Sequence, residues 1–245
     1  AAQDIVYYEE GQGVAYGAGT DADAHSQEEA DAHTVVYITQ PGTYTLSGTL
    51  SAGQIAVDLG DGAEEDPEAV MTIVLDGVDI TCTVAPAIIY ECGSADMETA
   101  TQTVDTSAAG ANVVIADGTE NRVTGSHVAK IYKPESVTLN ADGTAVEEAK
   151  KLHKYDGALY SKMSMNVSGG EAGTGTLEIV ADNEGLDSEL HLTINSGNIH
   201  ILAGNDGINT NEDGVSVTTI NGGTLRIEVT GETGEGDGID SNGWL

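Results

Sequence analysis

Three copies of one pattern end the sequence: TLEIVADNEGLDSELHLTINSG at 176–197, NIHILAGNDGINTNEDGVSVTTINGG at 198–223 and TLRIEVTGETGEGDGIDSNGWL at 224–245. Each copy contains a strand-like run, an acidic turn, the motif [DE]-G-[LI]-[DN]-[ST] and then an Asn close to glycine. A weaker copy begins with DGALYSK at 156–162. Repeats of this length are too short for propeller blades, and these lack the helices of an α-solenoid. The pattern predicts an all-β, right-handed, single-stranded parallel β-helix with three short strands in each coil.

The apolar positions of the repeats predict which side chains face the core. Alternate residues of a strand share one face, so residues at equivalent positions of successive copies should stack. We expect three inward columns, which are Leu177/Ile179 with Ile199/Ile201 and Leu225/Ile227; Leu186 with Ile208 and Ile239; and Leu192/Ile194 with Val217/Ile220. Asn195 and Asn221 occupy one corner, and we expect them to form a hydrogen-bonded ladder of structural importance.

The charge of the chain excludes several classes of partner. Only 8 Lys and Arg face 41 Asp and Glu, which gives a formal net charge of −33. Such a chain repels nucleic acid phosphates and anionic membrane surfaces, and it attracts divalent cations. No apolar run approaches the roughly 20 residues that a membrane-spanning helix needs, so we expect no membrane insertion. Cys82 and Cys92 lie ten residues apart, and either a disulfide or two free thiols fits them.

The sequence divides into a short N-terminal segment and a long repetitive region. Residues 1–33 are acidic and weakly patterned, and they predict a leader or cap, whereas residues 34–245 carry the strand-and-turn units of the β-helix. Two insertions are expected, at 93–111 and at 127–157, and the second is rich in lysine. Within it, residues 145–155 suggest a short helix with Glu147 and Lys151 paired at i,i+4. The last coil is expected to be truncated or to be completed by another chain.

The acidic turns predict a calcium site. Aligning the copies stacks acids and amides in columns, at coil spacings near 4.8 Å, where carboxylates repel each other. No Lys or Arg lies within the turns at 203–214 to neutralise them. Ca²⁺ accepts six to eight oxygen ligands from carboxylates, amides, carbonyls and water, so we expect it between the coils. The alternative is a solvated, splayed acidic face. The columns contain Glu184, Asp206 and Asp237, and then Asp187, Asn209 and Asp240.

These motifs carry a family resemblance. DGALYSK, NEGLDSELHLTINSG, NDGINTNEDGVSVTTINGG and GDGIDSNGWL, with PGTYTLSGTLSAGQIAVDL and LDGVDIT upstream, resemble the bacterial carbohydrate-binding parallel β-helix family. That family is typified by a clostridial cell-surface protein similar in fold to pectate lyases. The resemblance implies a secreted or surface-attached, calcium-bearing protein that binds cellulose-like or acidic polysaccharides. It also implies calcium ligands among Glu184, Asp187, Asp206, Asn209, Asp237 and Asp240, together with Asn183 and Asn205.

Three functions remain open at this stage. The first is non-catalytic binding of plant-type or acidic polysaccharide, in which calcium bridges the sugar carboxylates and Tyr132, Tyr155 and Tyr160 contact sugar; ordinary packing of these tyrosines is the alternative. The second is a structural surface or filament subunit that self-associates head to tail through its ends. The third is a calcium-dependent polysaccharide lyase, which would need an Arg or Lys base. Only Arg122 and Arg226 provide a guanidinium group, and nothing marks a catalytic pair, so we expect no enzyme.

Overall fold

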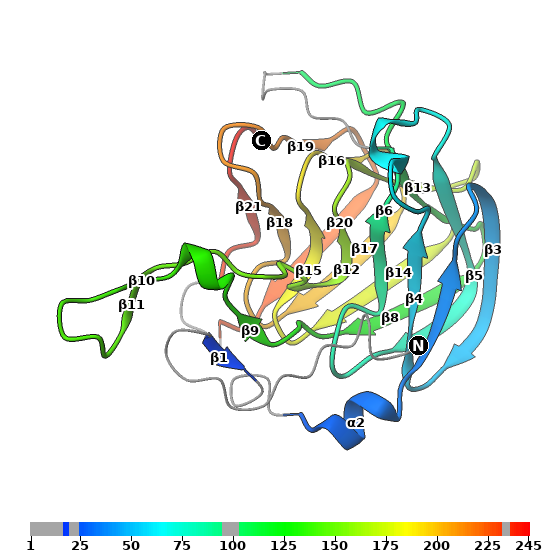
Figure 1. Ribbon diagram of the computed structural model, residues 1–245. Helices are drawn as coiled ribbons and strands as arrows, with labels where there is room; N and C mark the ends of the chain where they lie inside the picture. Colours follow the sequence, from blue (N-terminus) through cyan, green and yellow to red (C-terminus); the bar gives the residue numbers. More distant parts are fainter. Residues whose placement is uncertain (1–16, 20–24, 95–102, 232–235) are drawn as a thin grey trace.

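The computed structural model describes residues 17–19, 25–94, 103–231 and 236–245, and in these ranges it is almost entirely β (Figure 1). The strands of the main body follow one another across the molecule, from β2 and β3 (blue) to β21 (red). Their bounds are β2 (Thr34–Ile38), β3 (Gly42–Leu50), β4 (Gly53–Asp58), β5 (Met71–Thr81), β6 (Ile88–Cys92), β7 (Ala111–Ile115), β8 (Glu120–Gly125), β12 (Gly157–Ser161), β13 (Met165–Gly169), β14 (Thr176–Ala181), β15 (Glu184–Ser188), β16 (Leu192–Ile194), β17 (Asn198–Ala203), β18 (Ile208–Thr210), β19 (Thr218–Ile220), β20 (Thr224–Val229) and β21 (Ile239–Ser241).

Each of the first two repeats contributes one strand to each of three parallel ladders, and the last repeat contributes β20 and β21. One ladder is a seven-stranded sheet in the order β2-β4-β6-β12-β15-β18-β21. The other two belong to one ten-stranded sheet, because β5 pairs with β7 over Met71–Leu75 and with β8 over Asp79–Thr81. Between the segments of β5 that pair with β7 and with β8, the chain bends at Gly77, where φ is +76°. The Asn121 side-chain oxygen accepts hydrogen bonds from the backbone amides of Gly77 and Val78 there. The expectation of an all-β, mostly parallel protein is confirmed.

The expected inward columns form the core. Leu177, Ile199 and Leu225 are in register, as are Leu186, Ile208 and Ile239. The members in β14 to β18 are fully buried, and those of the outermost strands pack partly buried against them. The Asn ladder is also confirmed, because Asn221 donates to the Asn195 side-chain oxygen at 3.0 Å.

The third expected column needs a correction. Thr218, not Val217, lies opposite Leu192, while Ile194 pairs with Ile220. Val217 and Ile220 are three residues apart, so they cannot share one face of a strand. Val217 is buried instead at a bridge to Trp244, and Ile220 is 42% exposed.

The lysine-rich insertion does not contain the expected helix. It holds β9 (Lys130–Ile131), the 3-10 turn η4 (Pro134–Ser136) and an antiparallel hairpin of β10 (Thr138–Leu139) and β11 (Val146–Glu148). The Asn140 side-chain oxygen accepts hydrogen bonds from the backbone amides of Thr144 and Ala145, at 2.8 and 3.2 Å. These bonds hold the turn between β10 and β11. Glu147 is therefore an exposed strand residue, not a partner of Lys151 on a helix. The hairpin projects away from the sheets in Figure 1.

The other insertion and the N-terminal segment lie against the main body where they are described. Residues 95–102 of the expected 93–111 insertion fall outside the described ranges, and Thr106 contacts the side chains of Asn166 and Thr193 at 2.9 and 2.7 Å. Much of the expected 1–33 leader also falls outside them. Its described parts include β1 (Gly17–Gly19), which pairs with β9, and helix α2 (Gln27–Asp31). A 3-10 turn, η3 (Ala63–Glu65), follows β4.

Both cysteines are free thiols, so of the two alternatives for Cys82 and Cys92 the disulfide does not form. Cys82 is buried and Cys92 is half-buried. Among the helices in the described ranges, none is both long and apolar enough to cross a membrane.

Candidate functional site

The repeat motif places its acids and amides in one column on the outside of the seven-stranded sheet. Asp187, Asn209 and Asp240 are in register across β15, β18 and β21. The glycine of the motif is required by close packing, because a Cβ on Gly185 would lie 2.3 Å from Ile201 Cγ2 and 2.5 Å from a backbone oxygen of the next coil. The predicted column of Asp187, Asn209 and Asp240 is therefore in register.

Three members of these columns form what we call the inner oxygen group: Glu184, Asp187 and Asn209. They are 6%, 0% and 8% exposed. One side-chain oxygen of each (Glu184 Oε2, Asp187 Oδ2 and Asn209 Oδ1) is buried and accepts no hydrogen bond from any residue that the structure describes. A buried oxygen without a donor costs about 1–3 kcal/mol. Three of them in neighbouring coils call for a cation or water.

Burial makes negative charge in this group costly. It raises the pKa of Glu184 to about 7, and the neighbouring charges of Asp156 and Asp206 add to the rise, against a hydrogen bond from Asn209. Burial also raises the pKa of Asp187 well above its ordinary value, with Glu184 and Asp156 as the main neighbouring charges. Without a bound cation, the group therefore holds protons that exposed carboxyl groups would release near neutral pH.

Amide side chains and a lysine border the inner oxygen group. Asn209 Nδ2 donates to Glu184 Oε1 at 3.0 Å, and Asn211 Nδ2 donates to Asp187 Oδ1 at 2.5 Å. The Lys151 ammonium group lies 2.5 Å from Asp156. Burial lowers the pKa of Lys151, but the charges of Asp156, Glu184 and Asp187 outweigh that effect and raise it.

The other acids and amides of the predicted calcium set are arranged differently. Both carboxylate oxygens of Asp206 are satisfied, by Asn205 Nδ2 at 3.0 Å and by the Asp237 amide at 2.7 Å. Asp237 itself is exposed and Asp240 is half-buried. Asn183 points its amide toward the Asp156 carbonyl, at 3.4 Å. The structure thus brings together three of the eight predicted ligands as a group with unused oxygens.

The residue types of the inner oxygen group limit which metal ions it could bind. Within the described ranges, no group of three His, Cys, Asp or Glu side chains is arranged to hold a metal ion. The inner group has only two carboxylates, and its third member is an amide oxygen. That oxygen donor set is poor for zinc, but calcium accepts it.

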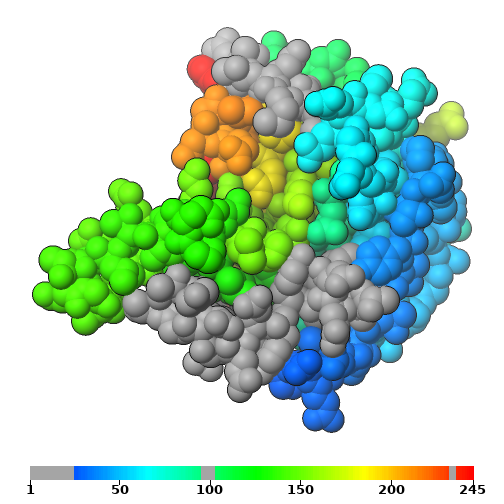
Figure 2. All heavy atoms as spheres, viewed as in Figure 1, coloured from blue at the N-terminus to red at the C-terminus, as the bar shows by residue number. Residues whose placement is uncertain are grey.

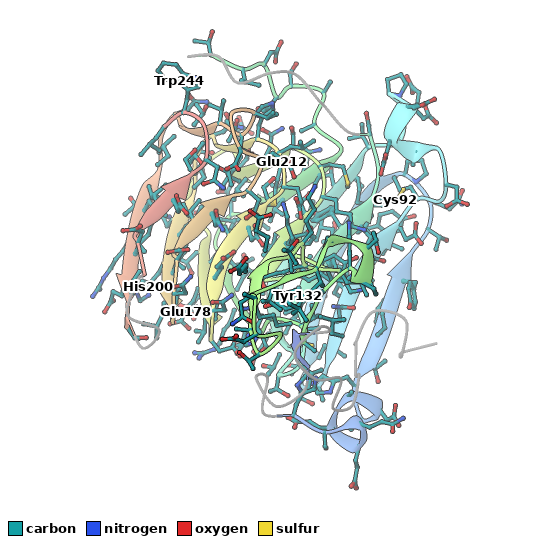
Figure 3. All side chains as sticks on the ribbon, turned by 60° about the vertical axis from the view of Figure 1, so that its left-hand side comes forward. Cys92, Tyr132, Glu178, His200, Glu212 and Trp244 are labelled. Carbon is teal, nitrogen blue, oxygen red and sulfur yellow. The ribbon has the colours of Figure 1, made fainter. Side chains whose placement is uncertain are left out.

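A hollow of about 420 Å³, which we call the lysine pocket, opens beside this group. In Figure 2 the surface is recessed between the η3 region (cyan), the segment near Glu212 (orange) and the insertion (green). Figure 3 shows Glu212 high on this face and Tyr132 lower, within the insertion. The pocket is lined by Glu64, Lys133, Lys151, Leu152, His153, Lys154, Tyr155, Tyr160, Lys162, Glu189, Leu190 and Glu212.

The three predicted sugar-binding tyrosines have different positions. Tyr155 and Tyr160 are 2% and 0% exposed, their rings lie 4.9 Å apart, and His153 stacks on the ring of Tyr155. Their hydroxyl groups donate to Glu91 and Glu189, each at 2.7 Å. They form the floor of the lysine pocket, so a ligand would meet His153 and the charged rim first. Tyr132 is not in the lining and lies under the Lys130 ammonium group.

Several residues of this region were missed in the sequence. Asp156, Asn211 and Lys151 contact the inner oxygen group or its neighbours, and Lys154 is held between Glu189 and Glu212 at 3.2 Å from each. The weak repeat DGALYSK was a signal for Asp156, because it aligns β12 with β15. No repeat signal marks the lysines, which come from the insertion.

Comparisons with known proteins identify a family. A family model described as "Carbohydrate-binding domain-containing protein" matches residues 32–244. A protein of the same description from Acetivibrio thermocellus is 31% identical over 169 residues, which are 69% of this chain but 45% of that relative. The solved structure of the polysaccharide lyase-like protein from C. thermocellum, a gadolinium derivative, is 23% identical, with a TM-score of 0.48, covering 86% of this chain and 83% of the other. The chain belongs to the carbohydrate-binding domain-containing family.

Proposed function

We propose that this protein binds carbohydrate, without catalysis, in the lysine pocket. The observation that carries the proposal is the rim, where Lys154 is fixed between Glu189 and Glu212, beside the His153–Tyr155 stack. Sugar hydroxyl groups both donate and accept hydrogen bonds, so a rim of fixed cations and carboxylates offers partners for both roles. The volume of about 420 Å³ falls within the range of small-molecule sites.

The test of carbohydrate binding is calorimetric titration with neutral and acidic oligosaccharides of plant cell walls. Lys154→Ala should weaken binding by about tenfold, since it removes one charge-assisted hydrogen bond. Lys150→Ala is a matched control, because Lys150 is exposed and outside the pocket lining. Wild-type protein that binds none of these oligosaccharides would refute the proposal.

We further propose that Ca²⁺ binds the inner oxygen group and stabilises the stacked coils. Glu184, Asp187 and Asn209 would each supply the oxygen that has no donor, and the ion would neutralise their negative charge. Thermal melts in excess Ca²⁺ and in EDTA test this proposal. We expect a higher melting temperature with Ca²⁺, and Asp187→Asn should reduce the increase whereas the exposed Asp213→Asn should not. An identical melting temperature in both solutions would contradict the proposal.

We infer that the chain winds as a right-handed single-stranded parallel β-helix. Its support is the three parallel ladders together with the general right-handedness of connections between parallel strands. We also propose a secreted or cell-surface location, where millimolar calcium would fill a weak site. Antibody labelling of intact and of broken cells tests the location. Labelling that appears only in the broken cells would count against it.

Two observations favour binding over a lyase reaction. Arg122 and Arg226 form ion pairs with Glu178 and Glu228 on the sheet that holds β8 and β20, each at 2.7 Å. Lys151, the lysine beside the inner oxygen group, has a raised pKa and is therefore a poor general base near neutral pH. Growth of ultraviolet absorbance from unsaturated products, on polygalacturonate with Ca²⁺, would overturn this assignment. Head-to-tail assembly into filaments stays a prediction, and gel filtration at high concentration tests it.

A further inference from the structure

The cationic residues of this acidic protein are concentrated in one place. The chain has 8 Lys and Arg against 41 Asp and Glu. Four of its six lysines line the lysine pocket, where the acidic lining residues are Glu64, Glu189 and Glu212. Both arginines lie on the ten-stranded sheet, in β8 and β20. The pocket is thus a local exception to a net charge of −33.

Two of the four lysines have their charge balanced by carboxylates. Lys151 pairs with Asp156 at 2.5 Å, and Lys154 pairs with Glu189 and Glu212. The other two, Lys133 and Lys162, form no ion pair with any residue in the described ranges. Their ammonium groups are therefore not held by a carboxylate of the described residues at ion-pair distance.

The charges of both lysines act on the stack of His153 and Tyr155. The Lys162 ammonium group lies 5.3 Å from the centre of the Tyr155 ring, on which His153 stacks. Burial, followed by the charges of Lys162 and Lys133, lowers the pKa of His153 to about 4. At neutral pH His153 is consequently uncharged and leaves both ammonium groups available to an incoming anion.

We propose that Lys133 and Lys162 are the specificity-determining residues of the lysine pocket, and that they bind the anionic substituent, a carboxylate or a sulfate ester, of a sugar residue seated beside His153. This inference rests on the proposed carbohydrate binding and adds the groups that select the sugar. The selection is a direct ion pair between protein and sugar. It therefore replaces the calcium bridge expected from the sequence.

The burial of the inner oxygen group separates calcium binding from sugar binding. Glu184, Asp187 and Asn209 are at most 8% exposed, so a calcium ion held among their unused oxygens lies beneath the surface. A sugar carboxylate in the lysine pocket would meet lysine ammonium groups instead. Binding of an anionic sugar should accordingly persist when calcium is removed.

The experiment compares trigalacturonate, a sulfated oligosaccharide and neutral cellotriose by calorimetric titration in EDTA. Lys133→Met and Lys162→Met remove the charge but keep most of the aliphatic stem. Each should weaken trigalacturonate binding by about tenfold, with cellotriose binding changed by less than about twofold. Lys150→Met is the control for an equal change of net charge outside the pocket, and Lys162→Arg should restore most of the affinity. The sulfated oligosaccharide shows which anionic substituent the pocket prefers.

The outcomes separate the inference from the proposed function. Unchanged trigalacturonate affinity in both Met variants, or loss of wild-type affinity in EDTA, would overturn the inference while leaving carbohydrate binding intact. Absence of binding to every sugar would overturn both. Should the Met variants fail to fold, the salt dependence of the wild type decides, because added NaCl weakens an exposed ion pair. We expect NaCl to weaken trigalacturonate binding and to leave cellotriose binding unchanged; equal effects on both would count against the inference.

Discussion

Glu184→Gln measures how much the negative charge of the inner oxygen group costs the fold. Glu184 is 6% exposed, and its pKa rises from 4.5 to about 7 in the folded protein, mainly through burial. The folded protein thus keeps a proton on Glu184 that the unfolded chain releases. Stability is fully present below pH 4.5, falls as the pH rises through the window to about 7, and is then constant. The difference of 2.5 pKa units corresponds to about 3 kcal/mol.

Glutamine removes the titration but keeps the carbonyl oxygen that accepts the Asn209 amide at 3.0 Å. In EDTA at about pH 8, Glu184→Gln should therefore be more stable than the wild type by up to about 3 kcal/mol, and at about pH 4 the two should be nearly equal. The assay is urea unfolding followed by far-ultraviolet circular dichroism. Glu171→Gln is the control for removing one carboxylate, because Glu171 is exposed.

Calcium should offset the stability advantage of Glu184→Gln. A ligand that binds only the folded state stabilises it by about 2.7 kcal/mol at a hundredfold excess over Kd. The wild type would gain this amount, whereas the variant has lost one carboxylate ligand and would gain less. The gap between the two proteins at about pH 8 should then shrink toward zero. A stability difference that is the same at both pH values and in both solutions would refute the reasoning.

Two further predictions concern packing and cysteine chemistry. Gly185→Ala should destabilise the fold by about 3 kcal/mol in urea unfolding, because its Cβ would overlap Ile201 and the Gly207 carbonyl oxygen; a stability equal to wild type would contradict the close approach of these coils. In the native protein a thiol reagent should modify half-buried Cys92 faster than Cys82, since burial raises the pKa of Cys82 to about 11 and covers its sulfur. Equal rates at the two thiols would indicate that Cys82 is reached through local opening.

The repeated part of the chain was predictable because each copy repeats the same constraint. Leu186 and Ile208 must face the core at equal positions, and the glycine before each must allow the next coil to approach. Register then follows from the alternation of side chains along a strand, and it brings Asp187 opposite Asn209. The prediction was wrong where a copy is longer, because the extended turn before β19 shifts Val217 off the face that Thr218 occupies.

The insertion was not predictable in the same way. Residues 145–155 have helix-forming composition, but the Asn140 side chain and the pairing of β10 with β11 hold the start of that segment as a strand. Pairing within a hairpin of this kind overrides a helix preference of a few tenths of a kcal/mol per residue. The structure was therefore needed to show that Lys151 and Lys154 pair with Asp156 and Glu189, which adjoin β12 and β15, and that the Tyr155 ring lies against Tyr160.

The division between repeat and insertion corresponds to a division of roles. A column of acids on stacked coils generates repulsion at a fixed spacing, which the proposed calcium ion would relieve at the inner oxygen group. An insertion has no such register, so it is free to place opposite charge at a single point. Three of the four pocket lysines come from the insertion, and Lys162 follows β12. The net charge of −33 therefore excludes polyanions as partners only for the surface as a whole. At the lysine pocket the local charge decides, and there it favours an anionic sugar.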